Sequence, residues 1–208
     1  NTGFFFFFFL TISNKVAAQY GSFSDRPKLF VQIIVGQMSN DVVLKLKNEF
    51  DGAGIRTLVS DGVYCSQVSF SHPYVFASSS IATIVTGAHP SMHGVIGDTY
   101  YDRKNQRTES SERLEVPAFS DELGRISPSS KIISLAFQRQ PALLAGGQRP
   151  GWVYWFDENL QKFMCLRGGK DSRTHPEILP DWARQMNEKQ FAAIYSEKVW
   201  TSQFPRLK

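Results

Sequence analysis

The sequence predicts an α/β fold, a mostly parallel sheet flanked by helices, and two observations carry that prediction. Three short apolar runs, at residues 29–35, 131–135 and 152–156, have the length and the β-branched or aromatic composition of buried strands. Segments with helical features lie between and after these runs. Strands that alternate with helices along a chain typically form one sheet whose faces are covered by the helices.

Composition places the chain among ordinary globular proteins. It has 208 residues, of which 42% are hydrophobic and 20% charged, so one core and one domain are expected. The formal net charge is +4, but the Lys and Arg residues are scattered and do not form the dense run of a nucleic-acid-binding arm. We therefore expect no nucleic-acid partner. A mildly basic surface would suit an anionic ligand, although a solvated surface is the simpler interpretation.

The N-terminus is the most biased stretch of the sequence. Phe4–Phe9 is an unbroken run of phenylalanine, and the small-residue stretch Val16–Ala18 follows a few positions later. This order is typical of a secretory signal peptide, and the apolar block is shorter than the roughly 20 residues of a membrane span. A buried strand is the alternative, but such a run does not alternate and would be hard to pack. We predict residues 1–18 to be a partial signal peptide and residues 19–208 a periplasmic or secreted domain without a membrane span.

The first strand begins a β-loop-α unit. Leu29–Val35 is apolar at nearly every position, which predicts a parallel strand covered on both faces. A break at Gly36–Asp41 and a modest helix at residues 42–49 follow. Because ligands bind outside the carboxyl ends of strands in such sheets, the loop after Val35 is a candidate site, as are those after Phe70 and Leu135.

The remaining elements are read from turn residues and periodicity. We predict a helix over residues 54–61 that ends at Gly62, a half-buried strand over 63–70, and a helix over 78–86 capped by a serine. A last helix, 181–187, begins after a proline. Cys65 and Cys165 lie 100 positions apart and form either a disulfide or a pair of buried thiols; neither indicates a metal site.

Three blocks of the sequence carry a family resemblance: Lys28–Met38, Ile81–Asp102 and Tyr154–Asp157. Together they resemble the alkaline phosphatase superfamily, in particular its type I phosphodiesterase/nucleotide pyrophosphatase branch, from about Arg26 to the end. The most specific element is Thr86–Gly94, which reads T-G-x-x-P-x-x-H-G. The resemblance implies an alkaline-phosphatase-like sheet, of which this chain is expected to hold an incomplete N-terminal portion.

The resemblance also implies a chemistry. In that family two zinc ions, held by Asp and His ligands, clamp the phosphate of a small-molecule ester. A Thr or Ser at a helix N-terminus attacks phosphorus, where the positive end of the helix favours the phosphoryl charge. The remaining metal ligands of the family lie further along than Lys208.

Several family positions hold residues that cannot do this work. Gly36 stands at the first metal-ligand position and has no side chain to bind a metal, while Asp41 would reach the site only if the loop folded back. Ala77 stands at the nucleophile position, where an alanine cannot attack phosphorus. Ser78 is a surrogate nucleophile if the alignment slips by one residue, but helix capping is the simpler role for it and its serine neighbours.

The phosphate-contacting positions are altered as well. Asp98 replaces an Asn, and a carboxylate there would repel a phosphate unless it were protonated or metal-bound. Arg139 keeps a guanidinium that can fork onto a phosphate, but the Lys that accompanies it in the family is missing. His89 and His93 stand four apart, yet Pro90 predicts a loop rather than a metal-binding helix, and the family reading makes His93 structural. The chain's other two histidines are His72 and His175.

Three functional hypotheses follow. The first is an active metal-dependent phosphomonoester or phosphodiester hydrolase with a surrogate nucleophile. The second is a periplasmic pseudoenzyme that binds an anion or a protein, and the third is a fragment of a longer degenerate chain. Four altered positions oppose the first, since loss of one essential group already costs orders of magnitude in rate. We expect a catalytically degenerate and truncated family member, with zinc as the cofactor of the family but none bound here.

Overall fold

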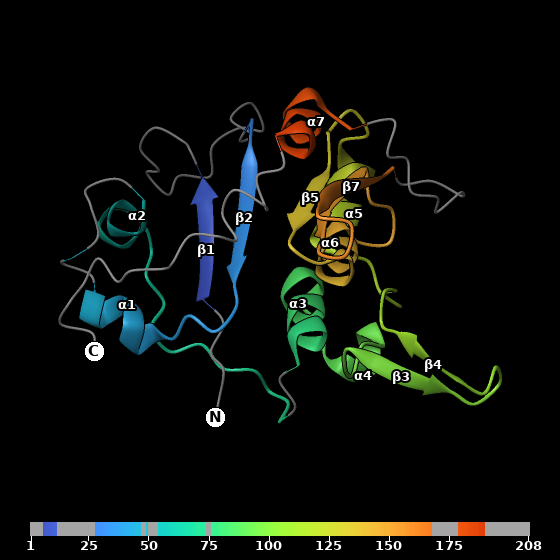
Figure 1. Ribbon diagram of the computed structural model, residues 1–208. Helices are drawn as coiled ribbons and strands as arrows, with labels where there is room; N and C mark the ends of the chain where they lie inside the picture. The colour runs from blue at the N-terminus through green and yellow to red at the C-terminus, as the bar shows by residue number, and fades with distance from the viewer. Residues whose placement is uncertain are drawn as a thin grey trace. The chain divides into compact units, whose positions relative to one another are not determined.

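The computed structural model describes residues 6–11, 28–46, 49, 54–73, 76–167 and 179–189. The chain divides into two compact units, Asn1–Val75 and Phe76–Lys208, called unit 1 and unit 2 below. Both contain helices and strands, which confirms the predicted α/β class (Figure 1). No helix in the described ranges is long and apolar enough to cross a membrane.

Unit 1 contains a two-stranded antiparallel ribbon. Strand β1, Phe6–Thr11, pairs with β2, Phe30–Val35, in a register that runs from Phe6 opposite Val35 to Thr11 opposite Phe30. The sequence correctly predicted β2, but it is neither parallel nor covered on both faces, because its described partner is the apolar N-terminal run and Ile33 stays 48% exposed. The assignment of residues 1–18 to a signal peptide concerns processing and stays a prediction.

Two short helices complete the described part of unit 1. Helix α1 spans Asn40–Leu46 and overlaps the helix predicted over residues 42–49, while α2 spans Ile55–Asp61 within the predicted range 54–61. The backbone at Gly62 is extended, with φ of −99°, so the helix ends there without a left-handed cap. The predicted strand over residues 63–70 is wrong: the segment is irregular and Val63 is 93% exposed, and a strand needs a neighbour to take up its backbone hydrogen bonds.

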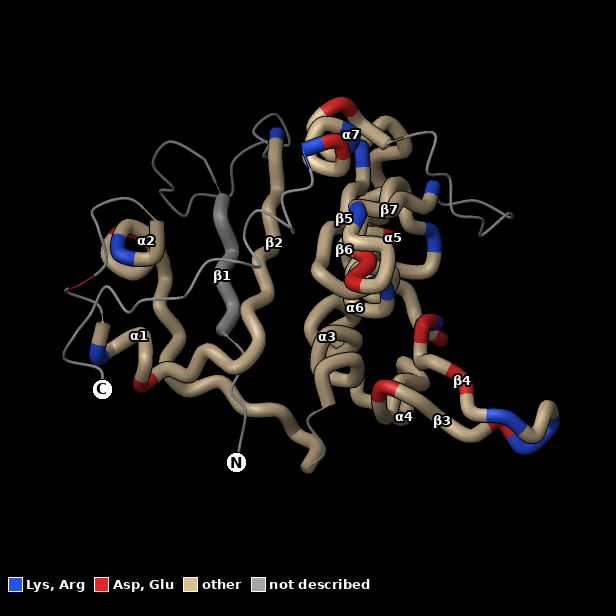
Figure 2. Tube along the Cα trace, in the orientation of Figure 1, with Lys and Arg blue, Asp and Glu red and all other residues tan. Residues whose placement is uncertain are grey.

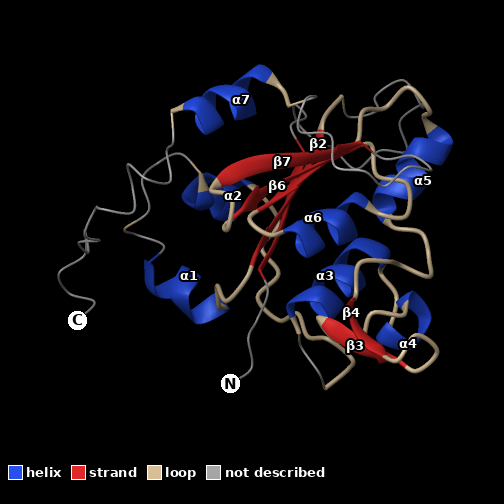
Figure 3. Cartoon of the chain, turned by 45° about the vertical axis from the view of Figure 1, so that its right-hand side comes forward, coloured by secondary structure: helices blue, strands red, loops and turns tan. Residues whose placement is uncertain are grey.

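Unit 2 is built on a three-stranded sheet with the order β5-β6-β7. The parallel pair β5–β6 places Ile133 opposite Trp152, and α6 is the helix of the crossover between them. The antiparallel pair β6–β7 is joined by a tight turn. Helices α6 and α7 cover opposite faces of this sheet (Figure 3). The bounds are β5 Ile133–Ala136, α6 Arg139–Gly146, β6 Trp152–Asp157, β7 Lys162–Arg167 and α7 Asp181–Glu188.

Alternate residues of β6 supply the two halves of the core. Val153 and Trp155 pack with Ala142 of α6, and Tyr154 packs with Ala183 of α7. Side chains of a strand point alternately to its two faces, so the nearly unbroken apolar run in β6 is explained by helices on both sides.

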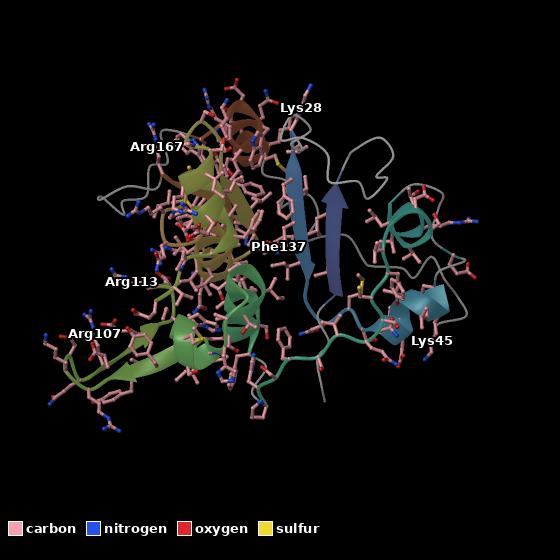
Figure 4. All side chains as sticks on the ribbon, turned by 180° about the vertical axis from the view of Figure 1, so that it is seen from behind. Lys28, Lys45, Arg107, Arg113, Phe137 and Arg167 are labelled. Carbon is pink, nitrogen blue, oxygen red and sulfur yellow. The ribbon has the colours of Figure 1, made fainter. Side chains whose placement is uncertain are left out.

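The strand β5 is buried on one face only. Ser134 is buried and donates a hydrogen bond to the carbonyl oxygen of Ala142 at 2.7 Å, so this face is turned to α6. Ile133 and Leu135 on the other face are 63% and 59% exposed, and Phe137 just beyond the strand is 81% exposed (Figure 4). The sequence predicted the strand correctly and overestimated its burial.

Helix α3, Ala77–Thr86, lies beside α6 and also contacts α4 and α5 (Figure 3). The one-turn helix α4, Pro90–His93, follows it, and α5 spans Phe119–Ile126. Strands β3, Thr99–Asp102, and β4, Arg107–Ser110, form a hairpin that projects from the unit and carries cations at its turn (Figure 2).

Candidate functional site

The site begins at the first turn of α3. Phe76 is the N-cap residue and Ala77 the first residue of the helix, and both are exposed. Ser78, Ser79 and Ser80 follow and are buried, with at most 1% of each exposed. The helix is where the sequence predicted it, but the expected serine cap is wrong. Ser79 Oγ instead donates to the carbonyl oxygen of Phe76 at 3.1 Å, because the serines lie inside the helix rather than before it.

The N-terminal end of α3 is capped by a residue from elsewhere in the chain. Asp98 Oδ1 accepts a hydrogen bond from the backbone N–H of Ser78 at 3.0 Å. The first N–H groups of a helix have no partner within it, and Phe76 has no side-chain acceptor to offer. Asp98 therefore takes the place that an N-cap side chain fills in most helices, and it lies at the surface.

A glutamine of α6 holds Asp98 in place. Gln140 Nε2 donates to the carbonyl oxygen of Asp98 at 2.6 Å and to that of Ser111 at 3.0 Å. The N–H of Ser111 also donates to the Asp98 carbonyl oxygen at 3.0 Å, so both ends of the β3–β4 hairpin are tied to the start of α6. The N-terminal ends of α3 and α6 thus meet at Asp98.

Arg139, the first residue of α6, lies beside this junction but is already engaged. Its Nη1 forms an ion pair with Glu112 Oε1, and its guanidinium lies 5.9 Å from the centre of the Trp155 ring. The stacked and paired geometry limits how freely the guanidinium can turn. Phosphate contact by Arg139 stays a prediction, and it would require competition with Glu112.

The block that carries the family resemblance forms a compact connection after α3. Gly87 and Gly94 have φ of 66° and 79°, in the left-handed region that favours glycine, and each ends a helix. Thr86 Oγ1 donates to the carbonyl oxygen of Ala82 at 2.6 Å. The loop predicted around Pro90 is wrong, because a proline fits the first position of a helix and Pro90 begins α4.

His93 is a fully buried structural residue of this connection. Its Nδ1 accepts the N–H of Val95 at 3.1 Å, and its Nε2 lies 3.0 Å from Thr83 Oγ1. Since Nδ1 is an acceptor, the ring is neutral with its proton on Nε2, which donates to the threonine. His89 is exposed, and its Nδ1 accepts the N–H of Ser91 at 3.3 Å. The two histidines have separate partners on α3 and α4.

The proposed metal-ligand positions lie in unit 1. Gly36 follows β2 in an exposed turn, and Asp41 is an exposed residue in the first turn of α1. The described ranges contain no group of three or more His, Cys, Asp or Glu side chains that could hold a metal ion. His72 is buried, with its ring centre 5.2 Å from that of Phe70, and His175 lies outside the described residues.

The structure thus brings together Ala77, Ser78 and Asp98 and places Arg139 beside them. Sequence reasoning missed Gln140, which positions Asp98, and Glu112, which pairs with Arg139. Gln140 directly follows Arg139 after a predicted strand, so its place offered some indication of a role. Glu112 gave no such indication, since it is one acidic residue in a polar stretch.

The cysteines are both free, Cys65 exposed and Cys165 buried, so no disulfide joins them.

Comparisons with known proteins agree with this fold. Residues 31–201 match the family described as type I phosphodiesterase / nucleotide pyrophosphatase. Alkaline phosphatase PafA of Elizabethkingia meningoseptica is 24% identical over 94% of this chain and 39% of its own length. Alkaline phosphatase PhoV of Synechococcus elongatus is 25% identical over 86% of this chain and 36% of its own length.

A solved structure shows the same fold over part of its length. The crystal structure of wild-type alkaline phosphatase PafA superposes with a TM-score of 0.69 at 20% identity, over 81% of this chain and 35% of that one. This chain therefore spans less than two fifths of the relatives that it matches. The alkaline-phosphatase-like α/β fold predicted from sequence is confirmed for this portion. The chain belongs to the type I phosphodiesterase / nucleotide pyrophosphatase family of the alkaline phosphatase superfamily.

Proposed function

We propose that this chain is a phosphate-ester hydrolase scaffold that has lost catalysis. The observation that carries the proposal is the exposure along the first turn of α3. Ala77 is accessible but has only a methyl group, whereas Ser78 and its two serine neighbours have hydroxyls but are buried. The accessible position offers no nucleophile, and the nucleophiles are not accessible.

Nucleophilic attack makes strict demands that this helix does not meet. The attacking oxygen must lie about 3–3.5 Å from phosphorus in line with the leaving group. The hydroxyl of Ser78, a residue that is only 1% exposed, cannot reach a phosphate in solution without unwinding the first turn. This opposes the alternative of an active hydrolase with Ser78 as surrogate nucleophile.

The metal site of the family is also unsupported by the residues present. Zinc in the catalytic sites of proteins needs three protein ligands with fixed geometry. Gly36 has no donor atom, and Asp41, exposed on α1, belongs to no group of three or more His, Cys, Asp or Glu side chains among the described residues. We propose that this chain holds no zinc pair.

The proposal extends to location. Phe4–Phe9 and the small residues Val16–Ala18 support export with cleavage after Ala18, and a periplasmic or secreted protein. N-terminal sequencing of the mature protein after expression in a Gram-negative host tests this. A mature chain that begins at Gln19 would support export, and retention of the phenylalanine run would contradict it.

The catalytic proposal is tested on the purified chain with p-nitrophenyl phosphate and bis(p-nitrophenyl) phosphate, with and without added zinc. We expect the same rate as for Ala77→Gly, a matched control that also lacks a hydroxyl and reports contaminating phosphatase. Turnover that depends on zinc and is lost in Ser78→Ala would overturn the proposal. Ala77→Thr alone is not expected to restore turnover, because Gly36 still offers no ligand.

A further inference from the structure

The end of α3 is occupied by a charge that belongs to the chain itself. The helix has 10 residues, and the Asp98 carboxylate accepts the Ser78 N–H at 3.0 Å. The aligned peptide dipoles give a helix N-terminus a partial positive charge, which favours an anion there. In this chain a side chain 20 residues further along supplies that anion.

The carboxylate is presented by a fixed backbone. The Asp98 carbonyl oxygen accepts from Gln140 Nε2 at 2.6 Å and from the Ser111 N–H at 3.0 Å. The two hydrogen bonds hold the Asp98 backbone, so the Cα from which the carboxylate extends cannot move away from α3 without breaking both of them. Any second anion that approached the helix end would meet a like charge at close range.

The same end of the helix is open to solvent. Ala77 and Asp98 are both exposed, so a dissolved anion can reach it. Ser80, in the same turn but fully buried, has a hydroxyl with no hydrogen-bond partner in the described part of the chain. The solvent-facing polar groups at this end of the helix are therefore the backbone N–H groups of the first turn and the Asp98 carboxylate.

We infer that Asp98 is a built-in anion that excludes phosphate-bearing ligands from the N-terminal end of α3. The inference rests on the proposed function in one respect, the choice of a phosphate as the ligand class. It revises the expectation that Asp98 contacts phosphate: the residue takes the place of the phosphate. Loss of the nucleophile and exclusion of the substrate would then be two separate changes in one turn of helix.

The test compares the full chain with Asp98→Asn, using inorganic phosphate as the probe. Asparagine removes the charge but keeps a carbonyl oxygen that can accept the Ser78 N–H. Phosphate affinity is measured by isothermal titration calorimetry, and the Tm is measured at increasing phosphate concentrations, both at constant ionic strength. We expect phosphate to bind Asp98→Asn at least tenfold more tightly than the unchanged chain and to raise the Tm of the variant alone.

A matched control separates local from general electrostatics. Asp102 is four residues further along, and its Oδ1 accepts the backbone N–H of Lys104 at 2.8 Å, so Asp102→Asn makes the same change in net charge at another carboxylate that caps backbone. It should bind phosphate like the unchanged chain. If Asp98→Asn and the unchanged chain bind phosphate with the same affinity, or if neither binds it measurably, the inference is overturned. It is also overturned if Asp102→Asn gains as much phosphate affinity as Asp98→Asn.

A second variant guards against misfolding. If Asp98→Asn does not unfold cooperatively, Asp98→Ser offers a short neutral cap and carries the same expectation. The outcome is independent of the catalytic test. Hydrolysis by the unchanged chain would overturn the proposed function, whereas the absence of a phosphate gain in both Asp98 variants would overturn only the exclusion by Asp98.

Discussion

The imidazole of His93 donates from Nε2 to the hydroxyl of Thr83, across a distance of 3.0 Å, while its Nδ1 accepts the N–H of Val95. The ring therefore holds the segment that follows α3, up to Val95, against the helix α3. Because the side chain is fully buried, removing the ring leaves the Val95 N–H and the Thr83 hydroxyl without their partner inside the unit.

We expect His93→Ala to lower the free energy of unfolding by about 2–4 kcal/mol, since it creates a cavity and leaves the Val95 N–H unsatisfied. Urea unfolding followed by tryptophan fluorescence measures the change. His89→Ala is the matched control, because His89 is exposed and caps the N-terminal end of the same short helix, and it should cost about 1 kcal/mol or less. Equal losses in the two variants would contradict the structural role of His93.

Gln140→Ala should loosen the base of the β3–β4 hairpin. It removes two side-chain hydrogen bonds, to the carbonyl oxygens of Asp98 and Ser111, each with a net contribution of about 1 kcal/mol. Hydrogen exchange at the Ser111 amide, which bonds to Asp98, should accelerate about tenfold or more for a local loss of about 1.4 kcal/mol. Gln138→Ala, two residues earlier and exposed, should leave that amide unchanged.

Asp121 stabilises the start of α5 and the loop after α6 together. Its Oδ2 accepts the N–H groups of Ala118 and Gln148 at 2.7 and 2.9 Å, and its Oδ1 accepts that of Arg149 at 2.8 Å. We expect Asp121→Ala to cost about 2–3 kcal/mol, because charge-assisted hydrogen bonds exceed neutral ones. Thermal unfolding followed by circular dichroism measures the loss of stability in this variant and in a control variant at the next residue.

The control is Glu122→Ala in the same turn. Glu122 pairs with Arg125 at 2.7 Å on the surface, and exposed ion pairs contribute about 0–1 kcal/mol. A loss in Glu122→Ala as large as that in Asp121→Ala would show that charge in the first turn, rather than the hydrogen bonds of Asp121, stabilises α5.

The fold should weaken at alkaline pH through Cys165 and Tyr154. Burial raises the pKa of the Cys165 thiol above its ordinary value of 9.0, and burial, together with the neighbouring thiol, raises the pKa of the Tyr154 hydroxyl. Both groups hold their protons more tightly when folded. Their contribution to stability is therefore complete below about pH 9 and is lost as the pH rises through the folded-state pKa values.

Chemical unfolding at pH 8 and at intervals up to pH 10.5 measures this loss. Tyr154→Phe should reduce the slope of the free energy of unfolding against pH, because one of the two ionising groups is gone. Cys65→Ser is the control, since Cys65 is exposed, and it should keep the full slope. A stability that is flat to pH 10.5 in the unchanged chain would contradict the prediction.

Much of this structure was predictable because local pattern and tertiary packing agree. The β6 run reads as a strand buried on both faces, and α6 and α7 do cover both faces. The predictions failed where pairing decides the outcome. Residues 63–70 alternate as a strand would, but no strand in the described part of the chain pairs with them. Strand β2 pairs with the N-terminal phenylalanine run that was interpreted as part of a signal peptide.

The candidate site shows a similar division. Ala77 and Gly36 were singled out because they stand at positions to which the family resemblance gives a chemical role that neither residue type can perform, and these assignments stay predictions. The cap on α3 could not be found that way, because Asp98 reaches Ser78 only through a hairpin whose base is tied down by Gln140. A contact between residues 20 positions apart depends on the path of the backbone.

The burial of the serines in α3 has a consequence for activity-based profiling. Fluorophosphonate probes label hydrolases by reacting with an accessible, activated hydroxyl, and Ser78, Ser79 and Ser80 are each at most 1% exposed. This chain should stay unlabelled in a proteome treated with such probes, and denaturation should not reveal an activated serine. A family member with this sequence pattern would be detected when protein abundance is measured but would not be detected by labelling with a reactive probe.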